Sequence, residues 1–372
     1  MQLGLSGPQQ TAYLARLFGS HDFQIEAEIL NLDEKVIGSA ILLDGQINLQ
    51  RGEGVRRTGS FVLSDPDNAL AFDAESLWGG SMWADRMLRI RHSLEVPGVG
   101  RVTVTPFVGV PSVLARSGGE ITVECQDKTA LAIRGSKPFA VREGANAVAS
   151  IKRIMRECTG EFRFRFPSSH RARLKRSYAV GWADEASPWA VCQRIARSID
   201  RQLVYDPDGA LSLRIRPTKP VLTFHANRSI LDLPETSIDF TQAANHVRVY
   251  GSKKKVLGIQ TLPHSHPLAP SRLQRRGVPR FLPLLIEEDY TKDRDAQQRA
   301  NVEAKRMAWM SEQIGTSVTP VFHLTSDDPV RLSTPDGDVI VRVSEASIPV
   351  GVGGDMSIGS QKWVSRPGRI RG

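Results

Sequence analysis

The chain has 372 residues, of which 40% are hydrophobic and 24% charged, values typical of a soluble globular protein with two to four domains. It contains no run of 18 uncharged apolar residues, which excludes an apolar membrane-spanning helix. Met1 to Ser20 is rich in glycine and glutamine and lacks the apolar core of a signal peptide, so we expect the chain to fold in a cytoplasm.

The net charge of +9 is concentrated in two segments. Residues 150–180 hold nine Lys or Arg and two acidic residues, and residues 251–280 hold seven Lys or Arg and none, so the rest of the chain is mildly acidic. This distribution does not favour a uniformly basic nucleic-acid-binding protein. The three cysteines, Cys125, Cys158 and Cys192, form no CxxC, which argues against a disulfide framework or a zinc knuckle.

Residues 1–139 are predicted to form a first β-rich, tube-like domain. Phe23 to Ile29 alternates apolar and polar residues, as expected of a strand with one buried face. Further short strand-like runs follow, separated by turn signals such as Pro97-Gly98 and Ser117-Gly-Gly119. Short strands at this spacing favour a sandwich or barrel over a parallel sheet.

Residues 140–234 are predicted to form a small α/β domain. Apolar residues at steps of three and four predict a helix from Ala145 to Cys158. A second helix is predicted to begin at Ser187-Pro188, a serine N-cap followed by proline in the first turn. A hairpin is then predicted around the turn Asp206-Pro-Asp-Gly209.

Residues 235–364 are predicted to form a second β-rich, tube-like domain. Its strands are interrupted by a proline-rich segment, 252–285, which we interpret as a long exposed loop or insertion and as the best candidate for an element ordered only by assembly. A helix is predicted over 293–310, and the basic residues 365–372 are expected to be a flexible tail. The predicted class is therefore α+β and β-dominated, with two tube-like β-barrel or sandwich domains flanking a two-helix α/β domain.

From about Ala40 to Trp363, this order of elements resembles the baseplate-hub family of tailed phages. Ile41-Leu-Leu-Asp-Gly-Gln-Ile-Asn-Leu49 and the run from Val55 to Pro66 are similar to the opening of minor tail proteins from actinobacterial phages. The other matching pieces, in chain order, are Trp189 to Arg216, Asn245-His-Val-Arg-Val-Tyr-Gly251, Asp336-Gly-Asp338 and Ile348 to Ile358. The resemblance also extends to the trimeric hub of contractile injection systems.

The resemblance implies a non-enzymatic structural subunit of the tail tip, located in the virion and assembled in the host cytoplasm. A homotrimer with two similar barrels per subunit would form a pseudo-sixfold ring beneath the tail tube. The implied partners are copies of itself, a distal tail protein or tail tube, and tip, tape-measure and receptor-binding proteins. Another ring position, such as a distal tail protein, is the nearest alternative.

The candidate interface residues are cations and tryptophans. Arginines alternate with Phe162, Phe164 and Phe166, which suits either a strand with one solvated face, an acidic neighbouring subunit, or transient contact with DNA in a lumen. The tryptophans suit either an interface anchor or core packing. The candidates are Arg163, Arg165, Arg171, Arg173, Lys175, Arg176, Lys253, Lys254, Lys255, Trp78 and Trp83.

No Walker loop, GxSxG elbow, HExxH motif or EF-hand loop is present, and we expect no cofactor, metal or catalytic site. His264-Ser-His266 could chelate a metal only with further ligands from elsewhere, and a surface loop is the favoured explanation of this pair. The aspartate pairs Asp65/Asp67, Asp206/Asp208, Asp327/Asp328 and Asp336/Asp338 lie beside Pro or Gly or within turns, which turn chemistry explains. A peptidoglycan- or carbohydrate-cleaving enzyme and a nucleic-acid-binding module are the competing classes.

Overall fold

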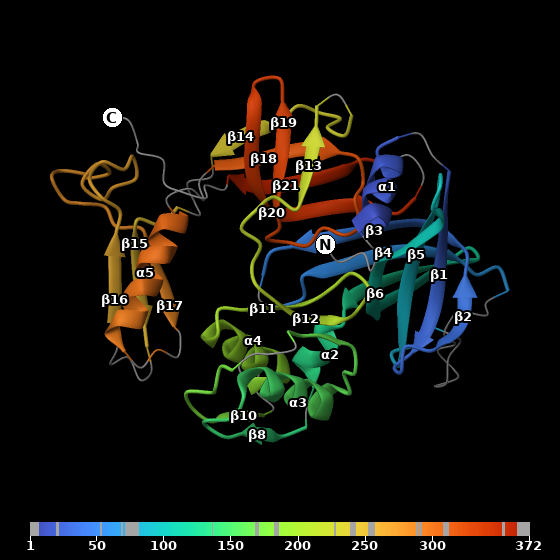
Figure 1. Cartoon of the computed structure of the whole chain (residues 1–372), viewed down its shortest axis with the longest axis horizontal. Coiled ribbons are helices and arrows are strands. Elements are labelled where there is room, and N and C mark those ends of the chain that lie inside the picture. Colours follow the sequence, from blue (N-terminus) through green and yellow to red (C-terminus); the bar gives the residue numbers. More distant parts are fainter. Residues whose placement is uncertain are drawn as a thin grey trace.

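The computed structural model describes most of the chain. The described residues are 7–19, 22–52, 54–67, 70, 82–135, 137–167, 171–181, 186–226, 228–238, 243–251, 257–287, 290, 292–307, 312–351 and 354–362. Within them the chain is β-dominated with a few helices, which confirms the predicted α+β class (Figure 1).

A thirteen-stranded sheet contains strands from both ends of the described chain. Its central path runs β14-β18-β21-β20-β3-β4-β7-β6-β5-β1-β2, and β13 and β19 extend it beside β20. The first half comprises β1 (Phe23–Asn31), β2 (Val36–Ala40), β3 (Leu42–Gln50), β4 (Arg57–Ser64), β5 (Arg86–Val96), β6 (Gly100–Ser117) and β7 (Glu120–Asp127). The second half comprises β13 (Leu222–His225), β14 (Glu235–Ile238), β18 (Glu312–Val318), β19 (Pro329–Thr334), β20 (Gly337–Pro349) and β21 (Met356–Lys362).

The two halves are joined by antiparallel pairing of β3 with β20, in which Ile47 lies opposite Ile348. Alternation of apolar and polar residues turns one face of each strand inward, as in β4, where Phe61 and Leu63 are fully buried. One continuous hydrophobic core then collects side chains from both halves. The two β-rich parts therefore share a sheet and a core.

Helix α1 (Gly7–Leu17) is an element that the sequence analysis did not predict. Its side chains Tyr13 and Leu17 are buried in the core of the large sheet, and the Tyr13 hydroxyl lies 3.2 Å from Nδ1 of His92 on β5. The apolar face of the helix is short, and glycine and glutamine around it mask the pattern.

The α/β unit has its own core and confirms the two predicted helices and the predicted hairpin. Asn146 caps α3 by accepting a hydrogen bond from the Ala149 amide, and Ser187 caps α4 by accepting one from the Ala190 amide. The elements are α2 (Thr129–Arg134), β8 (Phe139–Val141), α3 (Ala147–Thr159), β9 (Phe164–Arg165), β10 (Tyr178–Val180), α4 (Pro188–Ser198), β11 (Gln202–Tyr205) and β12 (Leu211–Arg214). The hairpin β11–β12 turns at Gly209, whose φ of +81° suits glycine.

A third small unit, here called the lobe, contains β15 (His246–Tyr250), β16 (Leu257–Thr261), β17 (Pro283–Glu287) and α5 (Asp293–Met307). Its three strands pair in the order β16-β15-β17, and α5 covers one face through Ala296 and Ala300. The described part of the predicted loop 252–285 is therefore not a continuous loop, because β16 and the start of β17 lie within it. The predicted helix 293–310 is confirmed as far as Met307; residues 308–310, like the predicted tail 365–372, lie outside the described residues.

Candidate assembly interface

The predicted interface arginines Arg163, just before β9, and Arg165, on β9, form ion pairs within the chain. Arg163 contacts Glu34 at 2.6 Å and Asp208 at 2.9 Å, while Arg165 contacts Asp206 at 2.9 Å and Asp208 at 2.5 Å. Arg163 therefore links the α/β unit to the turn between β1 and β2, and both arginines bind aspartates of the turn between β11 and β12. A partner subunit would have to compete with these carboxylates for either arginine.

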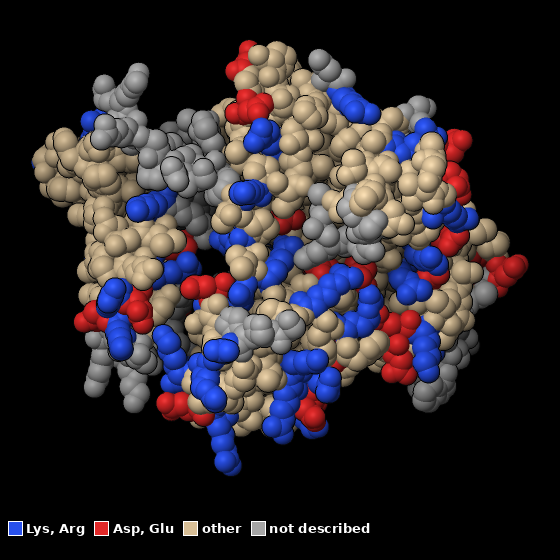
Figure 2. All heavy atoms as spheres, viewed as in Figure 1, with Lys and Arg blue, Asp and Glu red and all other residues tan. Residues whose placement is uncertain are grey.

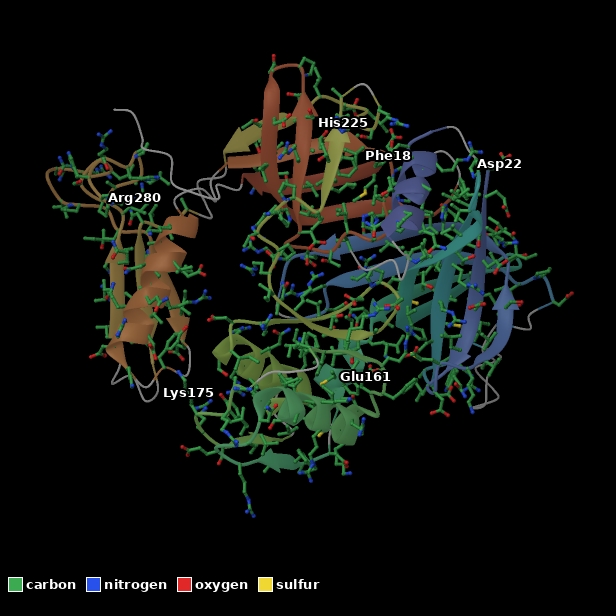
Figure 3. The ribbon with its side chains drawn as sticks, viewed as in Figure 1. Phe18, Asp22, Glu161, Lys175, His225 and Arg280 are labelled. Atoms are coloured by element: carbon green, nitrogen blue, oxygen red, sulfur yellow. The ribbon has the colours of Figure 1, made fainter. Side chains whose placement is uncertain are left out.

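Beneath these pairs lies a buried ion triad that the sequence analysis missed. The Lys128 ammonium contacts Glu34 and Glu161, each at 2.6 Å, and all three side chains are almost completely buried. Burial, followed by the Glu161 carboxylate, raises the pKa of Tyr205 well above its usual value. Figure 3 places Glu161 where the α/β unit faces the large sheet. The triad therefore ties these two units together.

A second charged network centres on Asp327, between the two halves of the large sheet and the α/β unit. Its carboxylate pairs with Arg51 at 3.1 Å and Arg216 at 3.2 Å, and accepts a hydrogen bond from Gln202 at 3.3 Å. Burial alone would raise the pKa of Asp327, but Arg216, Arg51 and Arg56 lower it below its usual value. A left-handed φ of +74° at Asp327 presents this carboxylate to the arginines.

Arg57, whose acidic neighbours include Asp127 and Asp328, is a buried cation that binds backbone carbonyls. It donates to Pro106 O at 3.0 Å and to Leu324 O at 2.5 Å, and its backbone amide donates to Asp127 at 2.9 Å. Burial lowers the pKa of Arg57 to about 10. The bonds to Pro106 and Leu324 join the first half of the sheet to the loop before β19.

The other basic candidates lie at or near the surface of the α/β unit. Arg171 and Lys175 are exposed, Arg173 is exposed and donates to Gly144 O at 2.8 Å, and Arg176 lies over the Tyr178 ring at 4.8 Å. Figure 2 shows Lys and Arg side chains gathered over this unit, in the lower part of the view. Lys175 faces the lobe and lies 3.8 Å from Asp295 of α5 (Figure 3).

The two tryptophan candidates and the lysine run are only partly described. Trp83, just before β5, is 36% exposed. Trp78, Lys253, Lys254 and Lys255 lie outside the described residues. The structure thus brings Arg163 and Arg165 together and leaves the other described candidates apart from them.

The histidine pair and the cysteines make local contacts. His264 Nδ1 lies 2.7 Å from the Ser271 hydroxyl, and His266 Nδ1 accepts a hydrogen bond from the Leu268 amide. The three cysteines are free thiols. The described residues contain no group of three or more His, Cys, Asp or Glu side chains placed to hold a metal ion. None of the described helices has the length and apolar character needed to cross a membrane.

A groove of about 1080 Å³ lies over β3, β20, β21 and β18. One wall is the segment 232–235 leading into β14, which carries the exposed Leu233 between Asp232 and Glu235, and Glu345 also lines the groove. Among the described residues, no lysine or arginine lines the groove. Apart from residues 232–234, the lining residues lie on paired strands of the large sheet, so the groove has a fixed floor.

No protein-family model matches the sequence, and no curated protein matches it. Solved structures do match along nearly the whole chain. The tail protein from Neisseria meningitidis MC58 superposes with a TM-score of 0.61 at 10% identity, covering 91% of this chain and 96% of that one. The 43 kDa tail protein of prophage MuSo2 from Shewanella oneidensis superposes with a TM-score of 0.59 at 12% identity, covering 90% and 98%. This chain therefore has the fold of these tail proteins.

Proposed function

We propose that the chain is a structural subunit of a phage tail tip, a baseplate hub that closes or adapts the end of the tail tube. The observation that carries the proposal is the match in fold over nine tenths of the chain to a prophage tail protein, which this chain also covers almost completely. The fold match extends over all three units of the chain, so it does not depend on one widespread domain.

The two buried charge networks support this role, because a ring subunit has to hold its parts in fixed positions. The triad at Lys128 ties the α/β unit to the first half of the sheet, and the network at Asp327 ties both to the second half. Buried ion pairs tolerate little displacement, since each charge would otherwise lie unpaired in a low dielectric.

We further propose that each copy contributes a first tube-like part (1–139), an α/β part (140–234) and a second tube-like part (235–364), with α2 packed onto the α/β part and β13 added to the second tube-like part, and that three copies form the ring. A closed ring buries the same surfaces in every copy. The inferred partners are the tail tube or a distal tail protein, and the tip, tape-measure and receptor-binding proteins. The inferred location is the tail tip of the virion.

A structural rather than enzymatic role is supported by the aspartate pairs. Asp206 and Asp208 are occupied by Arg165, and Asp327 is surrounded by arginines. Carboxylates engaged in this way are not available as the facing acid and base of a glycoside hydrolase.

The experiment is to measure the mass of the purified chain by sedimentation and to image the assembly by averaged electron microscopy. Rings with threefold symmetry support the hub. A sixfold ring would instead identify a distal-tail-type ring subunit. A chain that stays monomeric at all concentrations, and does not join a tail tip when mixed with tail-tube protein, would refute the proposal.

A further inference from the structure

A basic hairpin closed by one backbone bridge lies between β16 and β17 of the lobe. Arg275 and Val278 exchange backbone hydrogen bonds, each of 3.0 Å, around the two central residues Arg276 and Gly277. These two have φ values of +52° and +78°, the pattern of a two-residue type I′ turn. The basic hairpin, defined as residues 273–281, is therefore held in shape without a partner.

The side chains of this hairpin have no acidic partner among the described residues. Arg275, Arg276 and Arg280 are exposed and form no ion pair with a described carboxylate, and no Asp or Glu occurs from Leu257 to Ile286. Val278 and Phe281 beside them are 67% and 52% exposed. A surface that combines unpaired arginines with exposed apolar side chains is typical of an interface core and its rim.

The groove described above, here called the acidic groove, has the opposite character. Asp232, Glu235 and Glu345 are exposed and form no ion pair with a described cation. Leu233 on its wall is 67% exposed. Glu345 lies across Gly359, where a Cβ would stand 2.6 Å from its Cγ, so the absence of a side chain at 359 lets this carboxylate lie along the groove.

We propose that the basic hairpin of one copy docks in the acidic groove of the next copy, an inference that rests on the proposed ring. Guanidinium groups pair bidentately with carboxylates, and Val278 would meet the apolar wall at Leu233. In Figure 1 the loops between β16 and β17 stand at one end of the long axis of the molecule, where another copy can reach them. Because the two surfaces differ, the contact is head-to-tail, and such a contact closes into a ring when the rotation between successive copies completes a full turn.

Charge reversal on each surface, and then on both, tests this contact. Sedimentation is measured over a range of concentrations for the full chain carrying R275E/R276E, E235K/E345K, or all four substitutions. We expect each pair alone to raise the concentration needed for half-assembly at least tenfold, and the fourfold variant to restore it to near the original value. The control R134E/R142E reverses two exposed arginines on the α/β unit and is expected to change nothing.

Thermal melting of each variant at monomer concentration checks that it is folded. The contact is established if both double variants are folded but fail to assemble and the fourfold variant assembles again. The contact is refuted if the unaltered chain forms rings and the charge reversals leave them intact, or if the fourfold variant does not assemble again. The hairpin then binds something else, such as an acidic partner protein or nucleic acid, and the hub proposal stands. If the unaltered chain never assembles, both the hairpin–groove contact and the hub proposal are refuted.

Discussion

Replacing Lys128 by methionine is expected to destabilise the protein strongly. Met keeps most of the aliphatic stem, but it removes the charge that contacts Glu34 and Glu161 and the donor that reaches Gly209 O at 3.1 Å. Glu34 retains Arg163, whereas Glu161, which is 1% exposed, is left without its ion-pair partner. Removing one partner of a buried pair costs about 3–5 kcal/mol, so we expect a loss of that size in the free energy of unfolding.

The assay is urea unfolding followed by fluorescence, since urea does not screen charges as guanidinium does. The matched control is Lys137→Met, which removes the same charge from an exposed pair, 3.1 Å from Glu157, and is expected to cost less than about 0.5 kcal/mol. In the double variant K128M/E161Q the stranded charge is gone, so part of the loss should be recovered. A loss at Lys128 no larger than at Lys137 would refute the argument that the triad holds the units together.

Three further outcomes are expected. Burial lowers the pKa of His323 to about 3, so the stability that the neutral imidazole contributes is complete above about pH 6.5 and falls by about 1.4 kcal/mol per pH unit as the pH drops toward 3. In H323L the free energy of unfolding should therefore depend less steeply on pH over this range, and an equal slope would contradict the argument. Gly209→Ala should cost more than Gly277→Ala, because both have positive φ but only at Gly209 would a Cβ meet a neighbour, Val108 at 3.0 Å; equal melting temperatures would contradict it. A thiol reagent should label Cys158 in the folded protein and the two fully buried cysteines only after unfolding, which mass spectrometry can check.

Features encoded in neighbouring residues could be predicted from the sequence. The serine cap and proline at the start of α4 and the Asp-Pro-Asp-Gly turn of the β11–β12 hairpin are local signals, and the structure confirms both. The lobe was missed because β17 pairs in parallel with β15 across more than thirty residues, with prolines between them. No local pattern reports such a pairing.

Of the ion pairs around β9, the sequence predicted the arginines and not their acidic partners. The alternation of Arg163 and Arg165 with phenylalanines is visible in the sequence, but the partner Glu34 lies 129 residues away. Glu34 has a φ of +60°, and no residue around it indicates that its side chain is buried. The aspartates of the hairpin turn were explained by turn chemistry alone, although they also bind the arginines.

The pairing of β3 with β20 can form only late in the synthesis of the chain. Residues 42–50 leave the ribosome almost three hundred residues before their partner 337–349, so the outer edge of β3 stays open for most of translation. An unpaired edge of this kind attracts other chains, and long-range closure is slow. A chain truncated before residue 337 would lack both the floor of the acidic groove and the cover of this edge, and would aggregate rather than enter an assembly.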